Sequence, residues 1–236
     1  SRNTALGYNA MTDTTSGQNN TAVGTTALGN NTTATGNTAV GKSALADNTT
    51  GEENVAVGEN SLANNTTAGG NTAVGRGSMF TNTTGANNVG IGFDALYANT
   101  TGASNTALGK NALAANTTGY EQTAAGYRAL ATNTTGFRNT TFGADSLLLN
   151  TTGYDNSAFG KSALQDNTTG ETNTGLGNYA LANNTTADDN TAVGYQALTT
   201  NTTGTVNTAV GKNALLVNTT GGYNVAIGHE SMLANT

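Results

Sequence analysis

A glycine recurs every 17 residues along this chain without a slip, from Gly7 through Gly41 to Gly228. The spacing gives 14 copies of one unit with no insertion or deletion, and such internal repetition constrains a fold more than any other sequence signal. We count the unit from Asn3 and treat residues 1–236 as a single continuous repeat array. The chain is therefore expected to consist of stacked, nearly identical coils.

The unit reads N-T-A-V-G-x-x-A-L-x-x-N-T-T-G-x-x, as residues 190–206 illustrate. Eleven of its 17 columns are nearly fixed, and six vary: the sixth, seventh, tenth, eleventh, sixteenth and seventeenth. Every charged residue after Asn3 lies in one of these variable columns. Because charged side chains are rarely buried without a partner, we expect the variable columns to face solvent.

The fixed columns are expected to be buried or geometrically constrained. Apolar ladders are predicted for the fourth column, which holds Val, Leu, Ile or Phe in most coils, and for the ninth, which includes Leu45 and Leu62. The third and eighth columns hold small residues. The invariant glycine of the fifth column, as at Gly41, Gly58 and Gly75, indicates a positive φ or a backbone approach too close for a Cβ.

Short strands explain this unit better than helices do. Seventeen residues are too few for two helices with turns, and Gly, Asn and Thr are weak helix formers. The segments T-A-V-G, A-L and N-T-T-G are each expected to be extended and bounded by turns. The predicted fold is an all-β parallel β-solenoid, or β-roll, of about 14 coils with 17 residues each, stacked at about 4.8 Å.

The asparagines of the first and twelfth columns are expected to stack and to join coils through their side-chain amides, as for Asn48, Asn65 and Asn82 in the twelfth. Two apolar side chains per coil bury little surface against the entropy lost by 17 ordered residues. We therefore expect copies of the chain to associate, with the smooth Ala/Gly columns as the contact.

The segment T-A-V-G-x-x-A-L, seen as T-A-V-G-K-N-A at residues 208–214, resembles the head repeats of trimeric autotransporter adhesins, whose unit is S-V-A-I-G-x-x-A. With N-T-T-G added, the whole array is more similar to the tandem repeats of phage-type tail fibres that end in a self-cleaving trimerisation chaperone. The adhesin unit is shorter, so its coil shape and handedness do not carry over.

The resemblance implies a homotrimeric fibre outside the cell, at a cell surface or on a virion. It implies the role of a structural shaft or head that displays, or contributes to, the binding of a surface target. Because the array begins and ends within its pattern, we expect it to be part of a longer fibre protein.

Composition argues against several partners. The formal charge is −6, and the eight Lys and Arg residues are scattered, so nucleic acid is not an expected partner. No apolar stretch of 18 residues exists, so this segment is not expected to insert into a membrane. Cysteine is absent, which removes disulfides and thiolate metal sites.

No residue pattern indicates an enzyme, a cofactor or a metal. His229 is the only histidine and lies in a variable column, where a solvent-facing turn residue is expected. The acidic pairs Glu52–Glu53 and Asp188–Asp189 do not recur in neighbouring coils, as a calcium-binding array would require. Gly41-Lys42-Ser43 consists of repeat positions and lacks the helix that follows a phosphate-binding loop.

Exposed aromatic and threonine residues are the remaining candidates for function. The aromatic residues in the variable columns of the central coils form a predicted contact patch for a cell-surface glycan or protein: Phe80, Phe93, Tyr97, Tyr120 and Tyr127. The alternative function is that of an ice-binding or other repetitive-surface-binding solenoid, with the thirteenth or fourteenth column of Thr outward. The N-T-T segments also match glycosylation acceptors, but the same asparagines are expected to form ladders.

Overall fold

The computed structural model describes residues 2–235, and within them it contains one three-residue strand per coil and no helix. The chain divides into two compact units, residues 1–120 and residues 121–236, with seven strands in each. The first unit holds β1 (Thr4–Leu6), β2 (Thr21–Val23), β3 (Thr38–Val40), β4 (Val55–Val57), β5 (Thr72–Val74), β6 (Val89–Ile91) and β7 (Thr106–Leu108). The second holds β8 (Thr123–Ala125), β9 (Thr140–Phe142), β10 (Ser157–Phe159), β11 (Thr174–Leu176), β12 (Thr191–Val193), β13 (Thr208–Val210) and β14 (Val225–Ile227).

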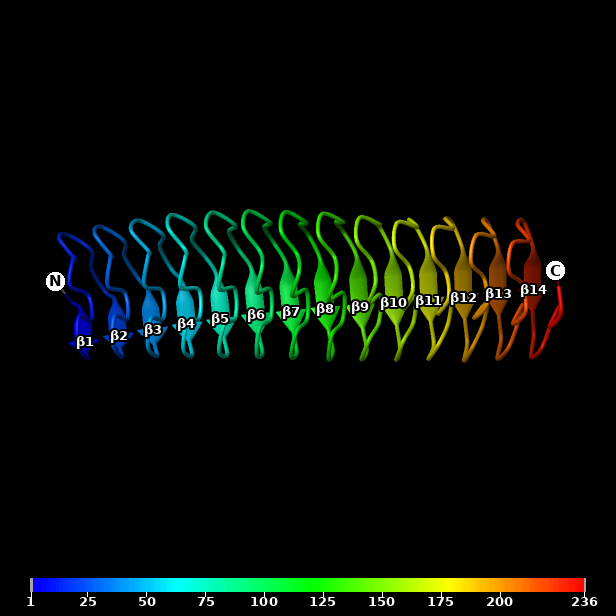
Figure 1. The fold of residues 1–236 in the computed structure, drawn as a ribbon, viewed down its shortest axis with the longest axis horizontal. Helices are drawn as coiled ribbons and strands as arrows, with labels where there is room; N and C mark the ends of the chain where they lie inside the picture. The colour runs from blue at the N-terminus through cyan, green and yellow to red at the C-terminus, as the bar shows by residue number, and fades with distance from the viewer. Residues whose placement is uncertain (1, 236) are drawn as a thin grey trace. The chain divides into compact units, whose positions relative to one another are not determined.

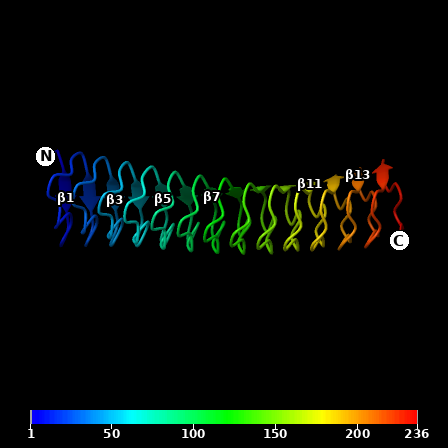
Figure 2. The same cartoon turned by 90° about the horizontal axis from the view of Figure 1, so that it is seen from above.

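Successive strands within each unit pair in parallel, so that each residue lies beside its counterpart 17 positions away. Val40 of β3 pairs with Val57 of β4, and Val193 of β12 pairs with Val210 of β13. The strands of each unit follow one another in a row, one per coil (Figure 1, Figure 2). The prediction of an all-β parallel solenoid with 17 residues per coil is confirmed.

Only the first of the three expected extended segments is a strand. The A-L and N-T-T-G segments form turns and bends, although they still bond to the next coil, as where the Leu28 N–H donates to the Ala44 carbonyl at 3.0 Å. The ninth residue has a left-handed backbone, with φ of 54° at Leu45 and 51° at Leu62, which a strand does not allow. A β-branched residue is disfavoured there, and this column holds only Leu or Met.

The interior of each unit is lined by the third, eighth and ninth columns. Ala39, Ala44 and Leu45 of the third coil are fully buried, and Leu62 continues the leucine ladder in the next coil. Burial of these side chains is the main apolar contribution to stability, because each leucine removed from water is worth about 2 kcal/mol.

The fourth column does not belong to this interior, which corrects one prediction. Adjacent residues in a strand point to opposite sides, so the buried third column turns the fourth outward, as with Ala39 and Val40. The same geometry overturns the expectation that copies associate through the Ala/Gly columns, because those columns lie inside the coil.

The invariant glycine of the fifth column is required by both conformation and space. Gly58 has φ of 134°, and a Cβ added to it would lie 2.6 Å from the carbonyl oxygen of Gly75. Gly41 and Gly75 have φ of 137° and 128°. A Cβ added to either would lie 2.5 Å from the carbonyl oxygen of Gly58 or Gly92, respectively. Any side chain here would push the coils apart.

Two buried asparagines in most coils share a carbonyl within their own coil, and their side-chain oxygens bond to the next coil. In the third coil, the Asn37 and Asn48 amides both donate to the Gly51 carbonyl at 2.9 Å. The Asn37 oxygen accepts the Asn54 backbone N–H at 2.9 Å, and the Asn65 amide donates to the Asn48 oxygen at 2.9 Å. Asn82 extends this ladder by donating to Asn65 at 3.0 Å, so the buried amides are satisfied coil by coil.

Candidate functional site

The ionisable residues that the structure describes are spread along the coils. Among residues 2–235, no three His, Cys, Asp or Glu side chains are placed to hold a metal ion. His229 is largely exposed, and its Nε2 lies 3.6 Å from Glu230. Glu52 and Glu53 are exposed at a turn, and the Asp188 carboxylate accepts the Glu171 backbone N–H at 2.9 Å. These carboxylates are solvated or support the turns.

One surface carries no charge in any coil. It is the sheet face, which we define as the outward side chains of the second and fourth columns, such as Thr38 and Val40 in β3. No charged residue occurs in either column in any coil. The fourth-column side chains remain substantially exposed in a single chain, at 36% for Val40, 41% for Ile91 and 43% for Phe142.

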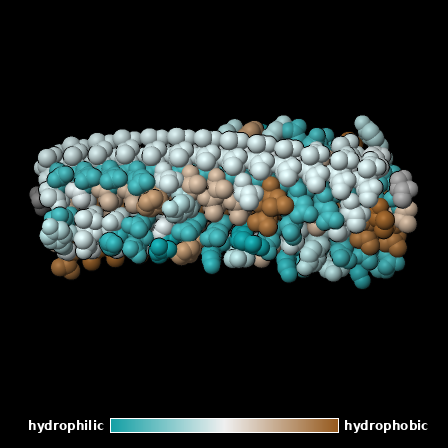
Figure 3. Space-filling view, in the orientation of Figure 1, coloured by the Kyte–Doolittle hydropathy of each residue, from teal (hydrophilic) through white to brown (hydrophobic). Residues whose placement is uncertain are grey.

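The fourth-column row is continuous within each unit because the strands pair in register. In the second unit the Phe142 and Phe159 rings stack with centroids 5.3 Å apart, and Leu176 follows in the next coil. On the face shown in Figure 3, by contrast, strongly hydrophobic residues gather only in separate patches. An exposed apolar row of this kind is unusual on a surface that faces water.

The predicted aromatic contact residues lie in several places. Phe80 and Tyr97 are brought together in neighbouring coils, with stacked rings 5.3 Å apart. Phe93 lies close by, with the Arg76 guanidinium 5.4 Å from its ring centroid. Tyr120 is in the sixteenth column of the first unit. Tyr127 is in the sixth column of the second unit, and the Arg128 Cζ lies 5.0 Å from the centroid of its ring.

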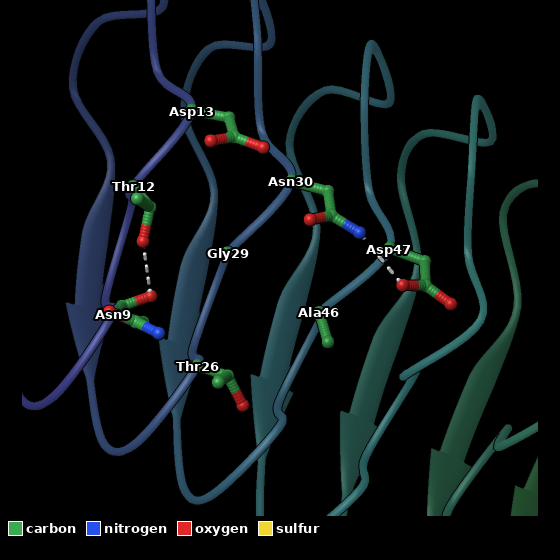
Figure 4. A pocket seen from close by; sticks show the side chains of 8 residues that line it. All are labelled: Asn9, Thr12, Asp13, Thr26, Gly29, Asn30, Ala46 and Asp47. Carbon is green, nitrogen blue, oxygen red and sulfur yellow. Dashed lines mark hydrogen bonds between the residues drawn. The ribbon is translucent and has the colours of Figure 1, made fainter.

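All of these aromatics except Tyr120 belong to the turn wall, meaning the sixth to eleventh columns of each coil, and the outer surface of this wall is hollowed. In the first three coils a polar hollow of about 400 Å³ has small tenth-column residues, Gly29 and Ala46, between polar side chains (Figure 4). In that hollow Asn30 donates to Asp47 at 3.0 Å, and the Thr12 hydroxyl donates to the Asn9 carbonyl at 2.9 Å. A second hollow, in the fourth to sixth coils, contains the Phe80–Tyr97 pair.

The threonines of the thirteenth and fourteenth columns, which were expected to face ice, do not lie on the flat face of the sheet. Hydroxyls of the thirteenth column are engaged by the next coil, as where Thr49 Oγ1 donates to the Thr66 carbonyl at 3.0 Å. The fourteenth column, including Thr50, is exposed at a bend. Sequence reasoning missed the second column, where Thr38 and its equivalents point outward on the sheet. The T-A-V-G alternation contained this signal, because residues two apart share a face.

The asparagines of the N-T-T segments lie inside the coils, since Asn48, Asn65 and Asn82 are fully buried. The described residues contain no helix that combines the length and the apolar character needed to cross a membrane. No protein-family model matches this chain, and no curated protein matches it either.

Proposed function

We propose that this chain is a structural segment, a shaft or head, of an extracellular homotrimeric fibre at a cell surface or on a virion. The sheet face carries the proposal, because it is an uncharged row of half-exposed apolar side chains repeated in coil after coil. The role is mechanical and involves no catalysis: the fibre holds a binding tip away from the surface that bears it.

Self-association is the simplest use of a surface with the period of the chain itself. A second copy offers the same 17-residue coil and therefore the same row of side chains at the same spacing. A hydrophobic row left in water is unfavourable, and packing it against its own copies around a symmetry axis removes it from solvent without an open edge. The number three rests on the resemblance of T-A-V-G-x-x-A-L to trimeric repeats.

The absolute mass of the purified chain, measured by light scattering after size exclusion at several concentrations, tests the proposal. We expect three times the chain mass of 23.5 kDa. Val57→Lys with Val74→Lys places charge on the sheet face and is expected to yield monomers. Ala98→Lys with Ala115→Lys adds the same charge on the turn wall and serves as the control. A parent chain that stays monomeric at every concentration would overturn the proposal.

A repetitive-surface binder, with ice as one target, is the second candidate, and one observation favours it. The second and fourth columns place rows of Thr and Val on a parallel sheet, with neighbouring coils about 4.8 Å apart. This use requires the sheet face to be free, and hence a monomer. Thermal hysteresis that disappears on Thr38→Lys with Thr72→Lys in a monomeric chain would select it over the fibre.

A further inference from the structure

The second hollow of the turn wall lies where the repeat departs from its own pattern. Gly77 is the only glycine in the seventh column, and Phe80 and Tyr97 are the only aromatic residues in the tenth. These exceptions occur in adjacent coils and line the same hollow of about 260 Å³. Because these departures from the repeat occur together at one hollow, that hollow is a candidate binding site.

The hollow has an aromatic wall and polar side chains around it. The Phe80 and Tyr97 rings are nearly parallel, at 13°, and Tyr97 is 38% exposed. Gly77 leaves the space open, because a Cβ there would contact the Asp94 carboxylate. The lining residues, taken together, are Asn60, Arg76, Gly77, Phe80, Asp94 and Tyr97.

The polar groups of the hollow are available to a ligand. Within residues 2–235 no hydrogen bond or ion pair engages the side chains of Asn60 or Asp94. Arg76 is positioned between the Glu59 carboxylate, 3.7 Å from its Nε, and the Phe93 ring. The hollow therefore presents a carboxylate, an amide and a guanidinium, which together accept and donate hydrogen bonds in fixed planes.

We propose that this hollow binds a neutral sugar, a pyranose that presents one unsubstituted C–H face. The apolar face of the sugar ring packs against the exposed surface of the Phe80–Tyr97 pair. The Asp94 carboxylate accepts hydrogen bonds from ring hydroxyls, the Asn60 amide both donates and accepts, and Arg76 donates. The hollow, at about 260 Å³, is slightly smaller than most ligand pockets, which begin at about 300 Å³. A hollow of this size suits one sugar ring.

Other ligands fit the hollow less well. A divalent cation needs several oxygen ligands, and Asp94 is the only carboxylate in the lining. An anion would meet Asp94, while the charge of Arg76 is shared with Glu59. The site is complete within one chain, so it stands independently of the proposed trimer.

Saturation-transfer NMR with methyl β-D-galactopyranoside and methyl β-D-glucopyranoside as probes tests the site. Irradiation of the aromatic protons is expected to transfer saturation to the sugar C–H protons of at least one probe. Phe80→Ala with Tyr97→Ala should weaken binding about fivefold or more. Both changes restore residues found elsewhere in this column, such as Ala46, so the coil is preserved.

A second variant fills the hollow without straining the backbone. Gly77→Asn places in this coil the residue that Asn60 and Asn111 supply in theirs, at φ of 57° and 58° against 66° for Gly77. Binding should be lost in this variant. Phe137→Ala with Tyr154→Ala removes another stacked pair, 4.8 Å apart, and should leave binding unchanged. Absence of transfer to both probes, or transfer as strong as in the parent in the first two variants, would overturn the assignment.

Discussion

The two outer walls of each coil differ although a single chain exposes both to water. On the sheet wall, the first to fifth columns, the outward second and fourth residues are uncharged in every coil. On the turn wall the outward residues change from coil to coil and include Lys42, Glu59, Arg76 and Asp94. Inside the coil, both walls are equally uniform, with Ala on one side and Ala-Leu on the other.

The interior columns and the outward side of the sheet wall each keep one character from coil to coil, and the physical reasons differ. The interior is uniform because each residue must fit its counterpart in the next coil, and that requirement is met within one chain. The outward side of the sheet wall is less constrained, since its fourth column holds Val, Leu, Ile, Ala and Phe, yet it stays uncharged in every coil. This uncharged outward row, repeated coil after coil, is the observation on which the proposed association rests.

The largest effect is expected where a uniform column meets the neighbouring backbone. Gly58→Ala forces a positive φ of 134° on alanine and places its Cβ 2.6 Å from the Gly75 carbonyl oxygen. We expect a loss of about 4 kcal/mol in unfolding free energy. Gly29→Ala on the turn wall meets nothing closer than 3.4 Å and should be nearly neutral. Urea unfolding followed by circular dichroism makes the comparison, and equal losses would contradict it.

The next effect compares two adjacent asparagines that face opposite ways. Asn65→Ala removes amide bonds of 2.9 Å to Asn48 and to the Ala68 carbonyl, and it leaves buried groups unpaired. The expected cost is about 3 kcal/mol. Asn64, one residue earlier in the variable eleventh column, should tolerate alanine within about 0.5 kcal/mol. Thermal midpoints measure both, and an Asn65→Ala variant as stable as its control would disprove a stabilising role for the ladder.

Periodicity in the sequence was enough to predict the coil length, the parallel stacking and the charged outer columns. It did not settle which side of the strand is the inner one. Hydrophobicity suggested that Val40 points inward, but Leu45 already fills the space between the walls, so only Ala39 fits there. The left-handed backbone at Leu45 and Leu62 was also hidden, because it depends on how the coil closes.

The candidate sites were only partly visible from the sequence. Phe80, Phe93 and Tyr97 could be selected as exposed aromatics in variable columns, but their relation to Gly77 could not. That relation arises because the seventh and tenth columns of adjacent coils lie around one hollow. The sheet face was missed because its threonines and valines are indistinguishable by composition from the residues of a buried strand.

A smaller, stabilising effect is expected on the inner side of the sheet wall. Thr141 occupies a third-column position that is Ala in most coils, and its buried hydroxyl has no hydrogen-bond partner among residues 2–235. Thr141→Ala should raise the unfolding free energy by about 1 kcal/mol, since a buried unpaired hydroxyl is unfavourable. Thr140→Ala, on the outward side of the same strand, should change it by less than about 0.5 kcal/mol. Destabilisation by Thr141→Ala in a urea titration would show that the hydroxyl is satisfied.

The smallest effect belongs to the variable columns, where an ion pair joins two coils of the second unit. Arg138 donates from Nε and Nη2 to the two carboxylate oxygens of Asp155, at 2.7 Å each, and this lowers the pKa of Asp155 below its ordinary value of 3.8. A folded-state pKa that is depressed contributes stability above the unfolded value and loses it as the pH falls through the folded one. Both side chains are partly exposed, so the contribution is under about 1 kcal/mol.

Arg138→Gln should therefore be less stable than the parent at neutral pH, and the gap should shrink as the pH is lowered below 3.8. Asp155→Asn is the matched variant, because it removes the titrating group and retains the contact of Arg138 with the Phe137 ring, 4.6 Å away. Its own gap should follow the same pH course. If the Arg138→Gln gap is independent of pH, the ring contact and not the ion pair stabilises this turn, and the variable columns contribute to stability through packing alone.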